Sequence, residues 1–362
     1  MKRHYPGWML AALSMAVSVV LLTILLELTF QFLPVASGLR SLSVTADEPV
    51  LRYTPNREYV YSRDWNFNMV NRGRVNNAGF VNDQDYVHQD TQPLFAVIGD
   101  SYVQAQMVPY DKTLHGRLAA AAKNNFRVYS FAASGAPLSQ YLIYASYAMS
   151  EWGAEALLIN VVGNDFDESH TNYKSMPGFW YYHPADGQSL RLQLAPLQRG
   201  SFTSVVQRSA LARYLFINLG VNNLGVGQLA AGPTSVFAGN TSTSTDPARV
   251  QTSLQVIDTF LSDLQHIPGF VPSRVLFTVD GFRYPDAATA GKGSYFEEMR
   301  TAFISRARAG GFEVSDLDPR FFVAHETVRE RFEFPMDGHW SENGHRIAFE
   351  AVLSSGLLST WP

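Results

Sequence analysis

Cysteine is absent from the 362-residue sequence. Its absence excludes disulfide bonds, thiolate metal ligands and cysteine nucleophiles, although it does not identify the cellular compartment. Basic residues are not in excess, because 28 lysine and arginine residues stand against 32 aspartate and glutamate residues, a formal net charge of −4. A nucleic-acid-binding domain needs a basic surface, so we expect no nucleic-acid partner.

Sequence motifs for metals and phosphates are also missing. The chain has no HExxH motif, no EF-hand loop and no cysteine–histidine cluster, and no P-loop or dinucleotide-binding glycine pattern follows the first predicted strand. Two glycine-rich segments, GVNNLGVG and AGPTSVFAG, lack the strand-to-helix context of a phosphate-binding loop. We therefore expect neither a metal ion nor a cofactor.

The N-terminus lacks charge over a long stretch. Lys2 and Arg3 precede a run of 19 uncharged residues from Trp8 to Leu26. As a helix this run is about 28 Å long, close to the thickness of a bilayer's hydrocarbon core. A cleaved signal peptide usually has a shorter apolar region of about 7–15 residues, and the segment PVASG at 34–38 is a weak cleavage site. We predict an uncleaved anchor with a short cytoplasmic stub at residues 1–34.

The basic flank also predicts the orientation of this anchor. Positively charged flanks stay in the cytoplasm. For a bacterial protein we therefore expect a single pass through the inner membrane, with the rest of the chain in the periplasm or another extracytoplasmic space.

From residue 93 onward, apolar runs alternate with amphipathic stretches. The runs predict strands at 94–99, 127–132, 156–163, 274–280 and 312–317, and the stretches predict helices at 114–124, 139–152, 251–264, 295–309 and after Ser341. This alternation implies right-handed crossovers and a parallel sheet that is covered on both faces. The predicted fold class is α/β: a three-layer α/β/α sandwich around a five-stranded parallel sheet.

Two further segments complete the predicted organisation. Residues 35–92 alternate polar and apolar side chains and predict an N-terminal extension with short strands. The main domain, 93–362, contains an insertion at 169–249 with a hairpin around Asp186–Gly187, a candidate amphipathic helix within 201–219 and a Gly/Ser/Thr-rich loop. We expect the insertion beside the carboxyl ends of the strands, as a lid or substrate wall or as surface decoration.

Polar side chains follow each of the first three strands of the main domain. The clusters are Gly99-Asp100-Ser101, Ala133-Ser134-Gly135 and Gly163-Asn164-Asp165, and the segment MDGHWSENGH at 336–345 precedes the last helix. The carboxyl-end loops of a parallel sheet share one edge, so we expect these clusters to meet there.

The residue types in these clusters suit acyl transfer. A serine hydroxyl needs a base, and a histidine base needs a carboxylate to orient it. Ser101 is the candidate nucleophile, His339 the base and Asp337 the orienting acid. The Gly135 N–H, the Asn164 side chain and the Ser101 N–H are candidate donors for an oxyanion hole.

At these residues the sequence resembles the SGNH, or GDSL, hydrolase superfamily. The matching features are GDSY at 99–102, the glycine of ASGAPLSQY, GND at 163–165 and the C-terminal Asp/His pair. The resemblance implies a flavodoxin-like fold, with Ser101 as nucleophile, Gly135 and Asn164 as oxyanion donors, and Asp337 and His339 completing a triad.

One feature departs from the usual pattern of that superfamily, in which the histidine lies three residues after the aspartate. Position 340 is tryptophan, so the match is to an Asp-x-His-Trp variant similar to the branch that includes alginate-type polysaccharide O-acetylation proteins. If Asp337 does not reach His339, the base would depend on another carboxylate or on a backbone carbonyl.

Four other residues receive supporting interpretations. We expect Asp100 to fix its loop and Asp165 to organise the site behind the reacting groups. Arg283 either holds an anionic group of a substrate or pairs with Asp280. Trp340 is either a platform for a sugar or part of the core.

These observations favour a membrane-anchored extracytoplasmic serine esterase or O-acyltransferase. The expected substrate is an acyl ester, most simply an acetyl ester, of a cell-surface or exported carbohydrate, or a small acyl ester. Two alternatives remain open: a lipase, lysophospholipase or thioesterase of the same superfamily, and a non-catalytic carbohydrate-binding or assembly component. The sequence identifies no protein partner, and the expected membrane contact is through the N-terminal helix.

Overall fold

A computed structural model of the chain describes residues 6–88, 91–123, 125–185, 189–198, 207–221, 237–238, 241–242, 244–335 and 337–361. The chain divides into two compact units. The smaller consists of Met1–Leu39, Tyr59–Arg72 and Gly200–Ala230, and the larger of Arg40–Glu58, Gly73–Arg199 and Ala231–Pro362. These units do not follow the predicted boundaries, because much of the expected N-terminal extension belongs to the larger unit.

The larger unit is built on a five-stranded sheet in the order β11-β10-β5-β3-β4. All four neighbouring pairs are parallel. The strands are β3(Leu94–Gly99), β4(Arg127–Ala132), β5(Ala154–Val161), β10(Val275–Val279) and β11(Glu313–Asp316). Every residue of β3 and β10 is buried, as expected for a sheet covered on both faces. The predicted fold class is confirmed.

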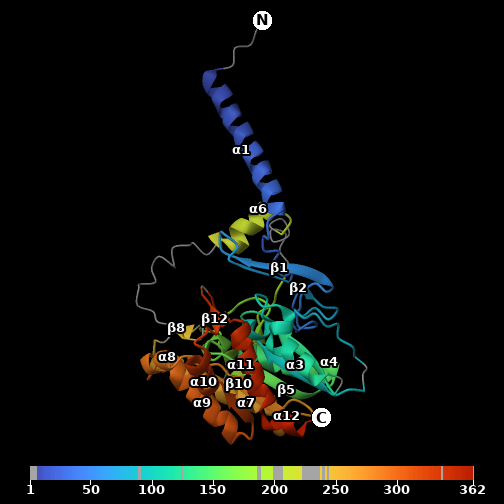
Figure 1. Ribbon diagram of the computed structural model, residues 1–362, viewed down its shortest axis with the longest axis vertical. Helices are drawn as coiled ribbons and strands as arrows, with labels where there is room; N and C mark the ends of the chain where they lie inside the picture. The colour runs from blue at the N-terminus through green and yellow to red at the C-terminus, as the bar shows by residue number, and fades with distance from the viewer. Residues whose placement is uncertain are drawn as a thin grey trace. The chain divides into compact units, whose positions relative to one another are not determined.

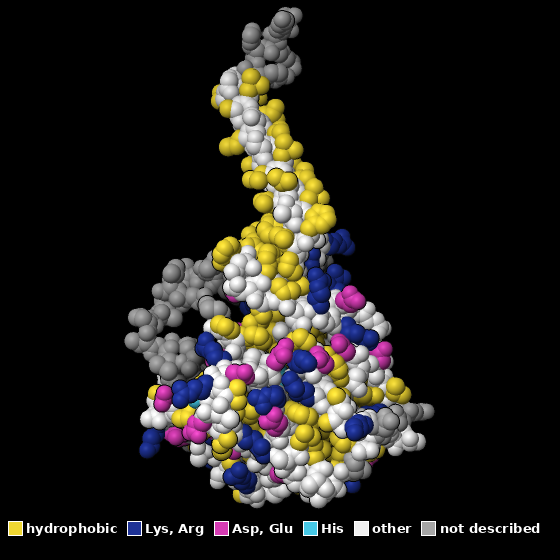
Figure 2. Space-filling view, viewed as in Figure 1, with side chains coloured by type: hydrophobic (Ala, Val, Ile, Leu, Met, Phe, Trp, Pro, Cys, Tyr) yellow, Lys and Arg dark blue, Asp and Glu magenta, His cyan; other side chains and the backbone are white. Residues whose placement is uncertain are grey.

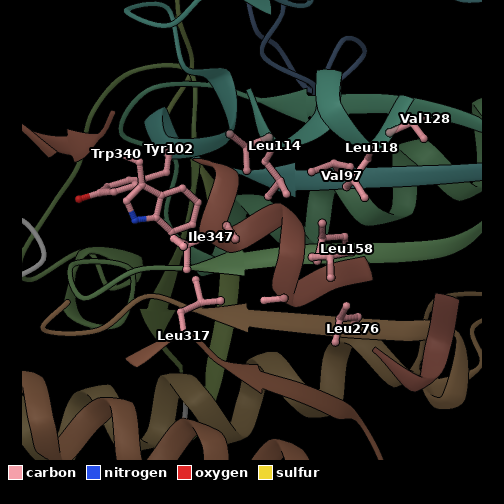
Figure 3. Packing of buried hydrophobic residues seen from close by; sticks show 14 of the residues in the cluster. Val97, Tyr102, Leu114, Leu118, Val128, Leu158, Leu276, Leu317, Trp340 and Ile347 are labelled. Atoms are coloured by element: carbon pink, nitrogen blue, oxygen red, sulfur yellow. The ribbon is translucent and has the colours of Figure 1, made fainter. Parts of the chain in front are cut away.

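Helices cover both faces of this sheet (Figure 1). On one face, Leu276 of β10 belongs to a buried cluster with Leu114 of α3(Leu114–Ala122) and Ile347 of α11(Glu342–Leu353), drawn in Figure 3. The next residue, Phe277, points the other way, because successive side chains of a strand alternate. Its ring contacts Phe260 of α7(Pro247–Gln265) and Phe303 of α9(Tyr295–Ala309).

The remaining helices complete the two layers. α4(Leu138–Trp152) contacts β3, β5 and α7, so it belongs with α7 and α9. α10(Asp318–Val328) and α12(Gly356–Thr360) contact α11. Side-chain caps fix several helix starts, including Thr113 before α3, Asp246 before α7 and Ser294 before α9. The predicted helix 295–309 is α9.

Shorter elements lie in the connections. They are α2(Ser101–Gln104), η1(Tyr110–Lys112), η2(Asp167–Ser169), η5(Pro272–Arg274) and α8(Pro285–Ala290), with β12(Glu333–Phe334) and β13(Asp337–Trp340) as an antiparallel pair. In the predicted insertion, β6(Trp180–Pro184) and β7(Leu190–Leu194) are antiparallel, as expected of a hairpin, and β8(Phe237–Ala238) pairs with β9(Thr241–Ser242). The expected turn at Asp186–Gly187 lies outside the described residues.

The smaller unit contains the apolar N-terminal helix, α1(Gly7–Gln31). α1 is long and apolar enough to cross a membrane, and none of its residues is buried. Figure 2 shows hydrophobic side chains along its length. The unit also holds most of the paired strands β1(Arg57–Arg63) and β2(Met69–Val75), and the short helix α6(Ala210–Arg213), which continues as the π-helical turn η3(Tyr214–Asn218).

Candidate active site

Ser101 lies two residues beyond the end of β3, the strand between β5 and β4 in the sheet. It is the first residue of α2, and Asp100 caps this helix by accepting a hydrogen bond from the Tyr102 N–H at 2.9 Å. Glycine is required at position 99, since a Cβ there would lie 2.4 Å from a methyl carbon of Val103. The chain therefore turns closely from strand to helix and presents the Ser101 hydroxyl at the carboxyl edge of the sheet.

Ser101, His339 and Asp337 form a continuous chain of contacts. The Nε2 atom of His339 lies 2.6 Å from the Ser101 Oγ, and its Nδ1 atom contacts an Asp337 carboxylate oxygen. The same carboxylate accepts a hydrogen bond from the His339 backbone N–H at 3.0 Å. Asp337 and His339 both lie on β13, where residues two apart point to the same side. An aspartate two residues before the histidine can therefore reach its ring.

A second carboxylate lies beside the serine. The Ser101 hydroxyl is 3.2 Å from Asp100 Oδ2, so its single proton has two possible acceptors, of which the imidazole is the closer. Burial raises the pKa of Asp100 to about 6, against the opposing effects of the Tyr102 N–H and His339. Asp100 thus holds the loop through its hydrogen bond from the Tyr102 N–H.

Asp165 supports the loop that follows β5. Its carboxylate accepts hydrogen bonds from the Tyr141 hydroxyl at 2.9 Å and from the Val162 N–H at 2.7 Å. Burial raises the pKa of Asp165 well above its usual range, and the nearby carboxylate of Asp100 raises it further. Both carboxylate oxygens accept hydrogen bonds from the loop or from the neighbouring helix α4, so Asp165 holds the loop in place and supports the reacting groups indirectly.

Arg283 holds the strand that carries the histidine. Its buried guanidinium donates to the Gly338 carbonyl at 2.6 Å, to the Tyr102 hydroxyl at 2.8 Å and to the Asp280 carboxylate at 3.2 Å. The Tyr102 hydroxyl donates in turn to the Gly338 carbonyl at 3.0 Å. Of the two roles considered for Arg283, the structure supports pairing with Asp280 and not contact with a substrate.

The same aspartate also fixes Trp340. The indole Nε1–H donates to Asp280 Oδ1 at 3.0 Å, and the ring is fully buried in the core. Trp340 is therefore a packing residue and not a sugar platform. Burial opposes the charged form of Arg283, but the adjacent Asp280 carboxylate outweighs it and raises the arginine's pKa above its ordinary value.

The two expected oxyanion donors follow the strands on either side of β3. Gly135 lies three residues beyond β4 and has φ +80°, a conformation that favours glycine. Asn164 lies three residues beyond β5. Its side-chain Oδ1 is buried and has no hydrogen-bond partner among the described residues.

Two residues that the sequence analysis did not single out connect these donors. The Lys174 ammonium donates to the Gly135 carbonyl at 3.0 Å and forms an ion pair with Glu168. Glu168 Oε2 accepts a hydrogen bond from the Asn164 amide at 2.9 Å. One lysine and one glutamate therefore bridge Gly135 and Asn164. The one signal that the sequence offered was their position around the start of the predicted insertion, with Glu168 just before it and Lys174 within it.

No group of three or more His, Asp or Glu side chains suited to a metal ion occurs among the residues that the structure describes. The reacting groups present are a hydroxyl, an imidazole, carboxylates and amides. This is the donor set of nucleophilic acyl transfer.

Comparisons with known proteins gave matches among solved structures alone. No family model and no curated protein matches the chain. A lipolytic G-D-S-L family protein from Veillonella parvula is 11% identical with a TM-score of 0.38, covering 73% of this chain and 97% of its own. The acetyl xylan esterase AlAXEase is 10% identical with a TM-score of 0.37, covering 72% and 98%. Phospholipase A1 from Streptomyces albidoflavus is 14% identical with a TM-score of 0.38, covering 73% and 99%.

The neighbours include proteins of the G-D-S-L family that the sequence motifs resemble. At these identities and TM-scores the likeness assigns no reaction, which is indicated by the side-chain geometry of the site. A parallel α/β sheet that carries a Ser–His–Asp chain of contacts at its carboxyl edge has the arrangement of a serine hydrolase.

Proposed function

We propose that the protein is a serine esterase or O-acyltransferase that acts through an acyl-enzyme on Ser101. The observation that carries the proposal is the 2.6 Å contact between His339 Nε2 and Ser101 Oγ, with Asp337 on the other imidazole nitrogen. Ser101 and His339 are 238 residues apart in the sequence, so the fold itself brings them together.

In the first half of the reaction, Ser101 Oγ attacks the ester carbonyl carbon while His339 Nε2 accepts the hydroxyl proton. Asp337 stabilises the resulting imidazolium through Nδ1–H. The tetrahedral intermediate then collapses, the carbon–oxygen bond to the alcohol breaks, and His339 returns the proton to the leaving oxygen. The acyl group remains on Ser101.

The second half runs in reverse with a new nucleophile. His339 takes a proton from water or from an acceptor hydroxyl, whose oxygen attacks the acyl carbon. The bond from that carbon to Ser101 Oγ then breaks, and His339 returns the proton to Oγ. Water gives hydrolysis, and a sugar hydroxyl gives acyl transfer. In both halves we assign the oxyanion to the N–H groups of Gly135 and Ser101 and to the Asn164 side chain, because preorganised donors stabilise that charge.

The finer assignment is an acetyl ester of a cell-surface or exported carbohydrate, attacked by a membrane-anchored enzyme outside the inner membrane. It is supported by α1, which is long enough to span a bilayer, and by the motif resemblance. Turnover of an acetyl ester with and without an oligosaccharide acceptor tests this. Formation of an acetylated oligosaccharide supports transfer, and release of acetate alone supports hydrolysis.

A lipase or thioesterase is the second candidate. Met176 is 40% exposed, and its terminal methyl lies 3.2 Å from where a Cβ on Gly135 would be, so an apolar side chain borders the proposed acyl site. A series of esters with acyl chains of increasing length separates the two. Activity that falls beyond acetyl supports the first candidate, and activity that rises with chain length supports the second.

A further inference from the structure

The C-terminal end of the apolar helix α1 contacts other segments of the smaller unit. The Glu27 carboxylate accepts hydrogen bonds from the Ser209 hydroxyl at 2.7 Å, from the Ala210 N–H at 2.8 Å and from the Leu211 N–H at 3.0 Å. Three residues further along α1, the Phe30 ring stacks on Tyr214 at 4.2 Å. α6 and η3 are thereby attached to the last turns of α1.

The position of Glu27 indicates the depth at which α6 and η3 lie relative to a bilayer. Glu27 directly follows the 19 uncharged residues from Trp8 to Leu26. A helix of that length fills the hydrocarbon core, about 30 Å thick, so the first charged side chain lies at its boundary. The first N–H groups of α6 bind Glu27, so α6 and η3 lie at the same boundary.

This segment exposes apolar side chains where a water-facing helix would have polar ones. Between Ser209 and Val221 the sequence has one charged residue, Arg213. The exposed side chains are Leu215, Phe216, Leu219 and Val221, each between 37% and 41% exposed. Figure 2 shows hydrophobic side chains gathered where α6 meets the end of α1.

An exposed tryptophan adjoins the same segment. Trp65 is 72% exposed, and its backbone carbonyl accepts a hydrogen bond from the Tyr214 hydroxyl at 2.9 Å. Tryptophan and tyrosine are enriched where membrane meets water, because one part of the ring is apolar and another is polar. Asn218 fixes the base of the segment, since its side chain accepts from the Ala36 N–H and donates to the Ser62 hydroxyl, both at 2.9 Å.

We infer that residues 209–221 together with Trp65 form a collar that docks on the headgroup region of the bilayer crossed by α1. Continuity with the apolar helix identifies the occupant as lipid, because the exposed apolar patch begins where the hydrocarbon-spanning run ends. The docked collar restrains the tilt of α1. It also holds the first segment that follows α1 outside the membrane at the bilayer surface. The inference requires α1 to be retained and does not depend on the reaction at Ser101.

The natural absence of cysteine permits a direct test. Single-cysteine variants Phe216→Cys and Leu219→Cys of the full chain carry a nitroxide label and are reconstituted into vesicles of phosphatidylethanolamine and phosphatidylglycerol. Val323→Cys, on α10 of the larger unit and 65% exposed, is the matched control. Accessibility of each label to oxygen, which concentrates in lipid, is compared with accessibility to a water-soluble nickel complex.

The expected result is a severalfold higher oxygen-to-nickel ratio at 216 and 219 than at 323. Equal ratios at the three positions would overturn the inference, and so would strong dipolar broadening between labels, which would mean that a second copy covers the patch. A second variant, Glu27→Ala in the Phe216→Cys background, removes the contact that positions α6. Its label should become more mobile, and an unchanged spectrum would contradict the role given to Glu27.

Discussion

Asp337 and His339 are neighbours on one side of the short strand β13, and the backbone and side chain of His339 both contact the same carboxylate. The usual spacing of three residues suits a loop or helix, whereas a spacing of two suits a strand, whose side chains repeat every second residue. The variant motif is therefore explained by the local structure that carries it.

This relationship predicts the effect of Asp337→Asn. The amide cannot stabilise an imidazolium and favours the wrong histidine tautomer, so kcat on a chromogenic acetyl ester should fall by about 10³- to 10⁴-fold with folding intact. Asp286→Asn, which changes an exposed carboxylate on α8, is the control and should keep its activity. A value of kcat within a few-fold of the unaltered protein would remove Asp337 from the mechanism.

The buried pair of Arg283 and Asp280 predicts a stability effect. Arg283→Met leaves the Asp280 carboxylate uncompensated in the core, which should lower the free energy of unfolding by about 3–5 kcal/mol. Adding Asp280→Asn removes the orphaned charge, so the double variant should be more stable than Arg283→Met alone. Urea unfolding measures both, and a double variant that is less stable than the single one would contradict this account.

The bridge from Lys174 to Gly135 and Glu168 predicts a kinetic effect. Loss of an oxyanion donor costs about 10²- to 10³-fold in kcat, and loss of its alignment should cost less. Lys174→Met should therefore lower kcat about tenfold with a smaller change in KM, while Lys174→Arg, which keeps the cation, recovers part of the rate.

Lys292, an exposed lysine elsewhere in the larger unit, provides the control for that experiment. Lys292→Met should leave kcat unchanged. If Lys174→Met changed KM alone, Lys174 would be a substrate contact and not a residue that positions the donors.

Asp100 predicts a pH dependence of stability. Its pKa is about 6 in the folded protein against an ordinary 3.8, so the folded state binds more protons in that window and stability falls as pH rises from about 4 to 6. The shift corresponds to about 3 kcal/mol of stability, present below pH 4 and lost as the pH rises through about 6. Asp100→Asn keeps an oxygen that can accept from Tyr102 and removes the titration.

The measurement is urea unfolding of both proteins at pH 4 and pH 8. The variant should gain stability relative to the unaltered protein at pH 8 and little at pH 4. The comparison cancels the buried histidines, such as His115, whose burial lowers the pKa to about 3 and which act in the opposite direction in both proteins. An equal difference at the two pH values would contradict the titration.

The sequence predicted the sheet well because its inner strands are buried on both faces. The run at 94–99 is apolar from end to end, the run at 127–132 is interrupted only by Arg127 and Ser130, and each is a strand of those bounds. A run of this kind can be assigned to a strand without knowing which strands lie beside it. The polar clusters after them were likewise visible, since a glycine, an acid and a serine end an apolar run abruptly.

Long-range polar contacts could not be predicted in the same way. Tyr53 lies in the expected N-terminal extension, yet its hydroxyl accepts a hydrogen bond from Gln104 at 2.8 Å, and Asn82 donates to Ser130 at 3.0 Å. Both contacts lie within the larger unit and depend on the path of the chain, which periodicity does not report.

The role of Arg283 was open for the same reason. Its guanidinium turns inward to Asp280, and its backbone adopts φ +67°, a conformation that arginine rarely takes and that nothing in the motif signals. Whether an arginine at a strand end faces a substrate or a buried aspartate depends on that local geometry.

The most direct test of the central claim is covalent labelling with a serine-directed fluorophosphonate, followed by mass spectrometry of the labelled peptide. We predict one adduct per chain on Ser101, no adduct in Ser101→Ala, and strongly slowed labelling in His339→Ala. An adduct that survives Ser101→Ala, or a native protein that takes no label, would contradict the assignment of Ser101 as the activated nucleophile.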